Sequence, residues 1–312
     1  MSKAHTFSMG PLVWFTGVVE DINDPKQLGR VKVRVYGYHS ASTSDIPTTD
    51  LMWAMVGGPT TSANISGIGQ TPHGLVNGTT VYGWFLDGDD AQTPLVIGTL
   101  PGAPANGPQA GQGFNDPNGT YPNYAAGESD INRLARGQTT DVAMVTTKQT
   151  NLVQSVSTAG GTGTGPQWSQ PKSPAAPVYP NNQVRMTTAG HIEEFDSTPG
   201  AERINRYHKS GTFVEIGPDG TQVTQVIKDN YTLIFGDNYV TIDGKCFINV
   251  SGDCRMQISG NAYMNVAGNK TEVIAGDYNL QVDGTLNLKV AGDYNNTVSG
   301  INTTKASTIM LN

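Results

Sequence analysis

The sequence predicts an all-β protein in which an amino-terminal barrel precedes a long repeat of short strands. Three observations lead to this fold class. The 312 residues include 38 Gly and 18 Pro with only 14% charged residues, a composition typical of turn-rich β proteins. Strand-like segments follow one another between residues 14 and 100, and in the carboxyl-terminal third a glycine recurs at every eighth position.

The amino-terminal segments predict a small five-stranded barrel. In the segment GRVKVRVYG, Val31, Val33 and Val35 alternate with Arg30, Lys32 and Arg34, so we expect one face of this strand in the core and the other in solvent. Five short strands without a helix-period stretch favour an OB-like barrel. The expected strands are Trp14–Asp21, Gly29–Gly37, Trp53–Val56, Thr79–Leu86 and Leu95–Leu100.

An OB-like barrel raises the possibility of nucleic-acid binding. The three basic side chains of the second strand, with Trp14, Phe15 and Tyr36 nearby, could form a stacking groove. The formal net charge of −7 argues against this, and a solvated strand face is the preferred interpretation. The acidic stretch Asp87–Asp90 is interpreted as a hairpin turn, since it lacks the remaining ligands of a calcium loop.

The glycine repeat continues without a slip through nine octads. Its glycines, the repeat glycines, are Gly236, Gly244, Gly252, Gly260, Gly268, Gly276, Gly284, Gly292 and Gly300. Two residues before them are Ile234, Ile242, Val250, Ile258, Val266, Ile274, Val282, Val290 and Val298. Four residues before them are Val240, Ile248, Met256, Met264, Leu280 and Leu288, with Glu272 and Asn296 as polar exceptions.

Aliphatic residues two positions apart lie on one face of a short strand, and Gly followed by Asp or Asn indicates a corner that needs tight-turn backbone angles. Each octad is therefore a strand of about five residues and a bend, as in a β-helix or β-prism. Two buried aliphatics per octad do not offset the entropy of ordering eight residues, so we expect these aliphatics to form the core of an intertwined homotrimer. A single-chain β-solenoid is the alternative.

Two kinds of polar or reactive residue stand out in the repeat. Glu272 and Asn296 mark either hydrated or ion-filled layers, or rungs turned outward. Cys246 and Cys254 share one octad position and are expected to be reduced structural thiols, because two cysteines alone are weak evidence for a metal site. We expect no cofactor, no bound metal, no signal peptide and no transmembrane helix.

Several segments resemble the central spike proteins of contractile phage tails, the T4-type baseplate hub and tail lysozyme family. WFTGVVEDINDPKQLGRVKVRVYGYHS, SANISGIGQTPHGLVNGTTVYGWFLDGDD and GFNDPNGTYP are similar to its OB-fold domain. The segment Ala189–Gly220 resembles the joint before the β-helix, also in the valine-glycine-repeat spikes of type VI secretion. The octads resemble the triple-stranded β-helix of the same proteins.

The resemblance implies a homotrimer in the tail baseplate of a virion, assembled in the host cytoplasm. Its barrel end would dock into the tail hub, and its β-helix would cross the host cell envelope when the sheath contracts. The family places a separate small tip protein on the β-helix, and the final residues STIMLN without His-x-His favour such a cap here. The implied domains are an OB-fold domain at 1–125, a linker at 126–180, the joint at 181–230 and the β-helix at 231–312.

The interval of about 126–178 is too short for the muramidase domain that T4-type proteins carry, and it is rich in Gly, Ser and Pro. A glycosidase needs two placed carboxylates, but Glu128, Asp130 and Asp141 lie in polar sequence. Glu193, Glu194 and Asp196 belong to the joint, and His191 and His208 have no recognisable nucleophile nearby. We therefore predict a non-enzymatic spike. The alternatives are a spike of a tailocin or type VI-like injection system, a cell-wall hydrolase with an unrecognised active site, and a receptor-binding fibre.

Overall fold

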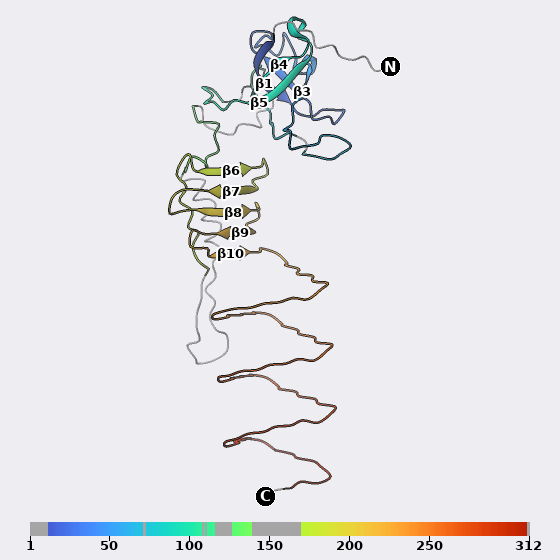
Figure 1. Cartoon of the computed structure of the whole chain (residues 1–312), viewed down its shortest axis with the longest axis vertical. Coiled ribbons are helices and arrows are strands. Elements are labelled where there is room, and N and C mark those ends of the chain that lie inside the picture. The colour runs from blue at the N-terminus through green and yellow to red at the C-terminus, as the bar shows by residue number, and fades with distance from the viewer. Residues whose placement is uncertain are drawn as a thin grey trace. The chain divides into compact units, whose positions relative to one another are not determined.

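The computed structural model describes residues 12–70, 73–107, 109, 111–115, 127–138 and 170–310, and every structural statement below concerns these residues. Within them the regular structure consists of ten β-strands and two short 3₁₀ helices (Figure 1). The chain divides into two units by contacts, the first formed by Met1–Ser155 with Trp168–Thr241 and the second containing Ile242–Asn312. Each unit is described by itself.

The first strands close into a barrel. They are β1 (Val13–Asp21), β2 (Val31–Val35), β3 (Trp53–Val56), β4 (Thr80–Phe85) and β5 (Pro94–Thr99). The barrel order is β1-β2-β3-β5-β4, antiparallel throughout except for the parallel β3–β5 pair. The 3₁₀ helix η1 (Thr48–Asp50) precedes β3, and η2 (Gly88–Asp90) joins β4 to β5. The five expected strands and the OB-like barrel are thus confirmed within one or two residues at each end.

Alternating side chains of these strands fill the barrel. The core residues are Phe15, Val19, Val31, Val33, Val35, Ala54, Val81, Phe85 and Val96. Gly83 lets β4 approach β5 closely, since a Cβ there would lie 1.9 Å from the Leu95 carbonyl oxygen and 3.1 Å from Cζ of Phe15. A close approach of this kind is the reason for glycine inside a strand.

One expectation about β2 is wrong. Lys32 and Arg34 were expected on a solvated face, but they are 7% and 0% exposed, and β2 is buried on both faces. Two loops cover the outer face: Arg34 donates to the carbonyls of Ser40 and Ile46, and a Cβ on Gly113 would lie 2.3 Å from Arg34 Nε. Strand alternation indicates two faces, but it does not reveal what a distant loop covers.

A second sheet forms from five strands that follow one another as a simple antiparallel meander (Figure 1). These are β6 (Asn182–Met186), β7 (Ile192–Asp196), β8 (Arg203–Tyr207), β9 (Phe213–Ile216) and β10 (Gln222–Gln225). The connecting turns contain Gly190, Gly200, Gly211 and Gly220, all with positive φ. Leu134, Ile192, Tyr207 and Phe213 form its small apolar core. The segment expected to be the joint lies within this sheet.

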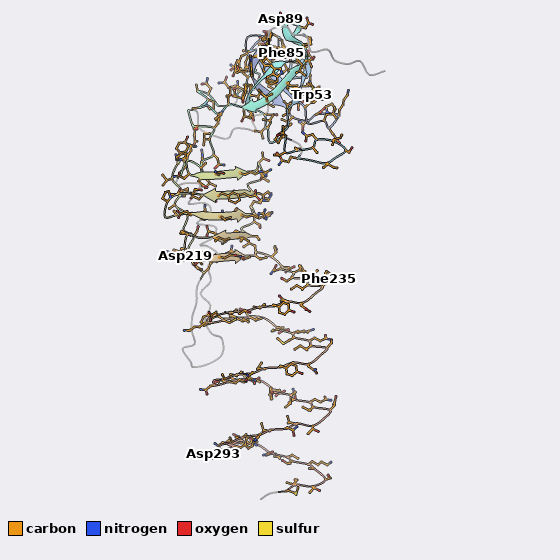
Figure 2. The ribbon with its side chains drawn as sticks, in the orientation of Figure 1. Trp53, Phe85, Asp89, Asp219, Phe235 and Asp293 are labelled. Carbon is orange, nitrogen blue, oxygen red and sulfur yellow. The ribbon has the colours of Figure 1, made fainter. Side chains whose placement is uncertain are left out.

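The octads follow an open path. From residue 226 to 310 the chain bends at every repeat glycine and forms no strand, because it makes no backbone-to-backbone hydrogen bonds with other described residues. Figure 2 shows side chains extending from this path into open space, as at Phe235, which is fully exposed. The chain therefore bends at each repeat glycine in the described stretch, and that these bends are corners of a prism stays a prediction.

Candidate functional site

Arg34, one of the basic residues considered for nucleic-acid binding, forms a buried ion pair with Glu20. Arg34 Nε lies 2.6 Å from Oε1 of Glu20, and both side chains are 0% exposed. Glu20 also accepts hydrogen bonds from Thr48 Oγ1 and the Phe114 amide, each at 2.9 Å. The guanidinium donates to two backbone carbonyls as well. With these bonds made, the pair joins β1, β2 and the covering loops, and it is enclosed away from any ligand.

The remaining basic groups of this region are also engaged. Arg30 Nη2 lies 2.6 Å from Oδ1 of Asp24, and Lys32 Nζ donates to the carbonyls of Thr48 and Thr49. Among the aromatics weighed for a stacking groove, Phe15 is in the barrel core. The basic and aromatic residues that would form a nucleic-acid groove are thus not assembled into one.

The outer barrel surface presents an apolar row across four strands. Strand register aligns Met55 with Leu95, Leu95 with Trp84, and Trp84 with Trp14. The two indole rings meet edge to face at 5.2 Å between centroids, and Trp14 remains 55% exposed. An exposed aromatic residue in an apolar row is typical of protein interaction surfaces.

The described carboxylates that were considered for glycoside hydrolysis are bound by neighbouring groups and are not placed as a catalytic acid and base. Arg133, with Arg136 beside it, holds the pKa of Glu128 below its usual value, which disfavours a general acid there. Asp130 Oδ2 accepts the Gly102 amide at 2.9 Å. Asp141 lies outside the described residues.

The acidic segment of β7 is part of a polar network under the second sheet. Glu194 is fully buried and lies 2.8 Å from Arg203 Nη2, and Asn182 and Asn205 donate to its two oxygens. Arg203 also contacts Glu215 at 2.8 Å. A carboxylate bound on all sides in this way has a structural role.

The two histidines meet, although their sequence spacing gave no sign of it. Their rings are 4.4 Å apart between centroids, His191 at the start of β7 and His208 after β8. Ser210 Oγ lies 2.8 Å from His208 Nδ1, a serine–histidine contact that was not predicted from the sequence. The same Nδ1 accepts the Ser210 amide across the β8–β9 turn, so the contact stabilises a turn rather than activating a nucleophile.

The acidic stretch between β4 and β5 is a turn. Asp87 accepts the amides of Gln92 and Thr93 at 2.8 and 3.1 Å, which holds η2 in place. The hairpin interpretation is confirmed. Within the described part of the chain, no group of three or more His, Cys, Asp or Glu residues could hold a metal ion.

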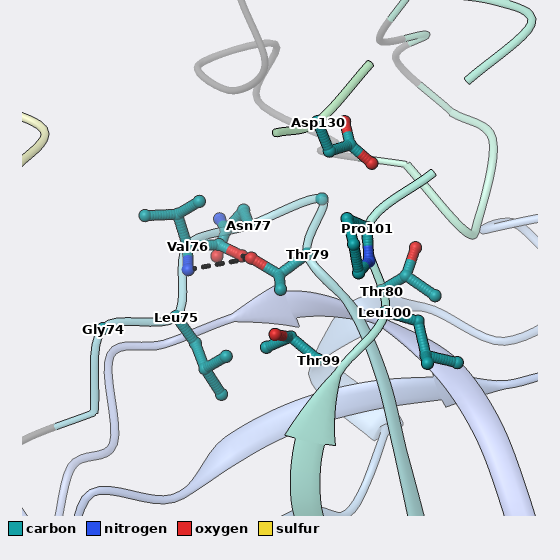
Figure 3. Close-up of a pocket in the computed structure, with 11 residues that line it drawn as sticks. Gly74, Leu75, Val76, Asn77, Thr79, Thr80, Thr99, Leu100, Pro101 and Asp130 are labelled. Carbon is teal, nitrogen blue, oxygen red and sulfur yellow. Dashed lines mark hydrogen bonds between the residues drawn. The ribbon is translucent and has the colours of Figure 1, made fainter. Parts of the chain in front are cut away.

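Figure 3 shows a pocket of about 500 Å³ beside the β4 and β5 ends. Its lining consists of residues 74–80, 99–101 and Asp130. Asp130 is its one carboxylate, and Oδ1 of Asn77 is buried without a hydrogen-bond partner. The pocket therefore lacks the pair of carboxylates that glycoside hydrolysis requires.

The inward aliphatics of the octads are uncovered in the single chain. Residues two before the repeat glycines are about half exposed, for example Val282 at 44% and Ile242 at 54%. Residues four before them are more exposed, from 61% at Leu280 to 84% at Ile248. The exposed apolar surface of these octad residues is far larger than the apolar patches that soluble monomers leave exposed. Both cysteines are also free and exposed in the single chain.

The backbone angles of the repeat glycines differ from those expected for tight turns. None of them has a positive φ, and an added Cβ would meet nothing within 4 Å in this chain. The expectation that the corners need special backbone angles is therefore wrong for the single chain. Neither the chain's own conformation nor its own packing accounts for glycine at these positions.

Taken together, the closed barrel, the antiparallel meander and the octads define an all-β protein with an OB-type domain. A family model described as the Gp5 N-terminal OB domain matches residues 36–174. Protein Gp5 of Vibrio phage KVP40 (isolate Vibrio parahaemolyticus/Japan/Matsuzaki/1991) is 38% identical over 249 residues, which cover 71% of this chain and 59% of that protein. Pre-baseplate central spike protein Gp5 of Enterobacteria phage T4 is 44% identical over 125 residues, 38% of this chain and 22% of that protein.

These matches confirm the resemblance to the central spike proteins of phage baseplates and the presence of a Gp5 OB domain. Both relatives are phage Gp5 proteins, and the T4 relative is named a pre-baseplate central spike protein. The chain spans about three fifths of the Vibrio phage relative and about a fifth of the T4 relative. No helix in the described part of the chain is long and apolar enough to cross a membrane.

Proposed function

We propose that this protein is the non-enzymatic central spike of a contractile phage tail, and that three copies intertwine through residues 231–312 into one prism. The open path of the octads carries this proposal. No backbone hydrogen bond joins residues within the described stretch 228–310, and the same stretch exposes its row of aliphatics. Unpaired strands with an uncovered apolar face need partner strands.

The repeat glycines support identical copies as those partners. Glycine at every corner has no cause within one chain, so a close approach by neighbouring chains at the prism edges would explain it. Three chains would bring the aliphatics at both octad positions together around one axis. Interchain strands and a continuous core would then stiffen a narrow rod that transmits axial load.

The barrel would dock into the tail hub through the apolar row of Trp14, Trp84, Leu95 and Met55. A separate tip protein would cap the other end, and the rod would pass through the host envelope on sheath contraction. The boundaries 1–125, 126–180, 181–230 and 231–312 belong to this proposal. A tailocin or type VI-like spike would use the same architecture and remains the alternative.

The non-enzymatic role is supported by the engaged carboxylates of the described residues. Glu128 and Glu194 are held by arginines, and Asp130 is alone in its pocket. The purified protein is therefore expected to release no products from peptidoglycan. Muramidase or peptidase activity at the level of a cell-wall hydrolase would contradict the proposal.

The assembly is tested by a matched pair of substitutions in the repeat. Val282 lies in phase with the inward aliphatics and Thr285 in the opposite phase. Val282→Asp should abolish the heat-resistant trimer in detergent and by sedimentation, because an isolated buried carboxylate costs several kcal/mol. Thr285→Asp should leave the trimer intact. Equal effects would overturn the phase assignment, and a monomeric parent protein would overturn the trimer.

A further inference from the structure

Octads that share one pattern of glycine and aliphatic positions leave the alignment of the chains undetermined. If three chains share the prism, sliding one chain by eight residues again places aliphatic residues beside aliphatic residues and glycine beside glycine. The hydrophobic pattern therefore gives no preference between these registers. A residue that differs between octads has to supply it.

One octad differs by an ion pair on its inward face. Lys270 Nζ lies 3.0 Å from Oε2 of Glu272, and the two side chains are 58% and 51% exposed in the single chain. Glu272 occupies the position that is aliphatic in Met264 and Leu280. Residues two apart on a strand share a face, so the pair lies on the side of Ile274.

The other side-chain contacts within single octads lie on the opposite face. Tyr239 donates to Asp237 at 3.0 Å, and Gln281 donates to Asp283 at 2.9 Å. Both pairs occupy odd positions relative to the inward aliphatics and would remain in solvent. Among the described octads, the ion pair of Lys270 and Glu272 is therefore distinctive in placing both charges on the inward face.

We propose that Lys270 and Glu272 form an ion-pair rung inside the prism, and that this rung fixes the axial register of the three chains. This inference rests on the proposed trimer. The rung would contain three lysines and three glutamates, so its charges balance without a bound metal ion. Of the alternatives left open for Glu272, a layer inside the prism or a rung turned outward, this proposal favours the layer inside the prism, with its charges neutralised by Lys270.

The energetics favour a role in register rather than in overall stability. An exposed ion pair contributes little to the stability of the single chain. A buried ion pair often stabilises a protein no more than apolar residues of similar size would. A chain displaced by one octad would instead place its charged pair at the level of Met264 or of Leu280 of its neighbours, depending on the direction. A polar residue at a core position is a known means of fixing register at a cost in stability.

The register of the chains can be measured on the full-length protein by pulsed electron paramagnetic resonance, which gives the distances between spin labels on different chains. A spin label is attached to Thr285→Cys, on the outward face, in a Cys246→Ser/Cys254→Ser background. The intact rung should give one interchain distance. In Lys270→Leu/Glu272→Leu the trimer should persist but show a second population displaced by about 5 Å along the axis, one strand spacing.

Glu272→Leu alone would leave three buried lysines without partners, and the trimer should dissociate in hot detergent about 100-fold faster than the parent. The double variant should dissociate at close to the parental rate. A single distance in the double variant, an unchanged rate in Glu272→Leu, or a second population produced in the parent by EDTA alone would overturn the rung. A monomeric parent would instead overturn the proposed trimer.

Discussion

Arg34 and Glu20 form an ion pair that is completely withdrawn from solvent at the side of the barrel, with Nε and Oε1 2.6 Å apart. Two loops and two strands meet on this pair, since Arg34 binds the Ser40 and Ile46 carbonyls and Glu20 binds the Phe114 amide. It thereby converts two segments without regular structure into a fixed cover over β2.

Breaking this pair should unfold the barrel more readily. Arg34→Met leaves the Glu20 carboxylate buried and without its cation, and we expect a loss of about 3–5 kcal/mol in the free energy of unfolding. The double variant Arg34→Met/Glu20→Leu should recover part of this loss, because no unpaired charge remains. Urea denaturation followed by tryptophan fluorescence measures both. A single variant as stable as the parent would contradict the structural role.

Gly83 should be intolerant of any side chain. A Cβ there would lie 1.9 Å from the Leu95 carbonyl oxygen, so Gly83→Ala must push β4 away from β5, at a cost of about 1–3 kcal/mol. Gly74→Ala is the matched control, because nothing lies within 4 Å of its added Cβ. Thermal melts should separate the two variants, and equal midpoints would refute the close approach.

The loop from Asp24 to Arg30 should lose stability in acid. The Arg30 guanidinium, with the amides of Lys26, Leu28 and Arg30, holds the pKa of Asp24 well below its ordinary value. A carboxyl group with a depressed folded-state pKa stabilises the protein above its unfolded pKa, and this contribution is lost as the pH falls toward the folded pKa.

The parent and Asp24→Asn should therefore differ in melting temperature at pH 7 and converge as the pH is lowered below about 4. Asp89→Asn removes a carboxylate from an exposed turn and controls for net charge. Melting curves between pH 7 and pH 2 provide the measurement. A constant difference across this range would show that the Asp24 charge is not the cause.

Gly276→Ala should weaken the trimer although it disturbs nothing in the single chain. With open space and an ordinary φ, this change alone should be neutral or stabilising by about 0.4–1 kcal/mol. Faster dissociation of the trimer in hot detergent would reveal crowding by partner chains at the corner. Unchanged or slower dissociation would count against glycines as prism edges.

Much of the fold followed from local patterns in the sequence. The alternation of Val31, Val33 and Val35 predicted β2 because strand side chains alternate between faces, whatever covers them. The hairpin at Asp87 followed from turn chemistry for the same local reason. The repeat determined where the chain bends, since spacing along the chain is a property of the sequence alone.

Contacts between distant residues were decided only in three dimensions. Arg34 is buried because Glu20, on the neighbouring strand, neutralises it and residues 38–51 and 111–115 cover it. The contact between the His191 and His208 rings likewise depends on the register of β7 and β8. Burial and ion pairing depend on what is near in space, and a pattern along one strand contains no information about the loop or the partner that will cover it.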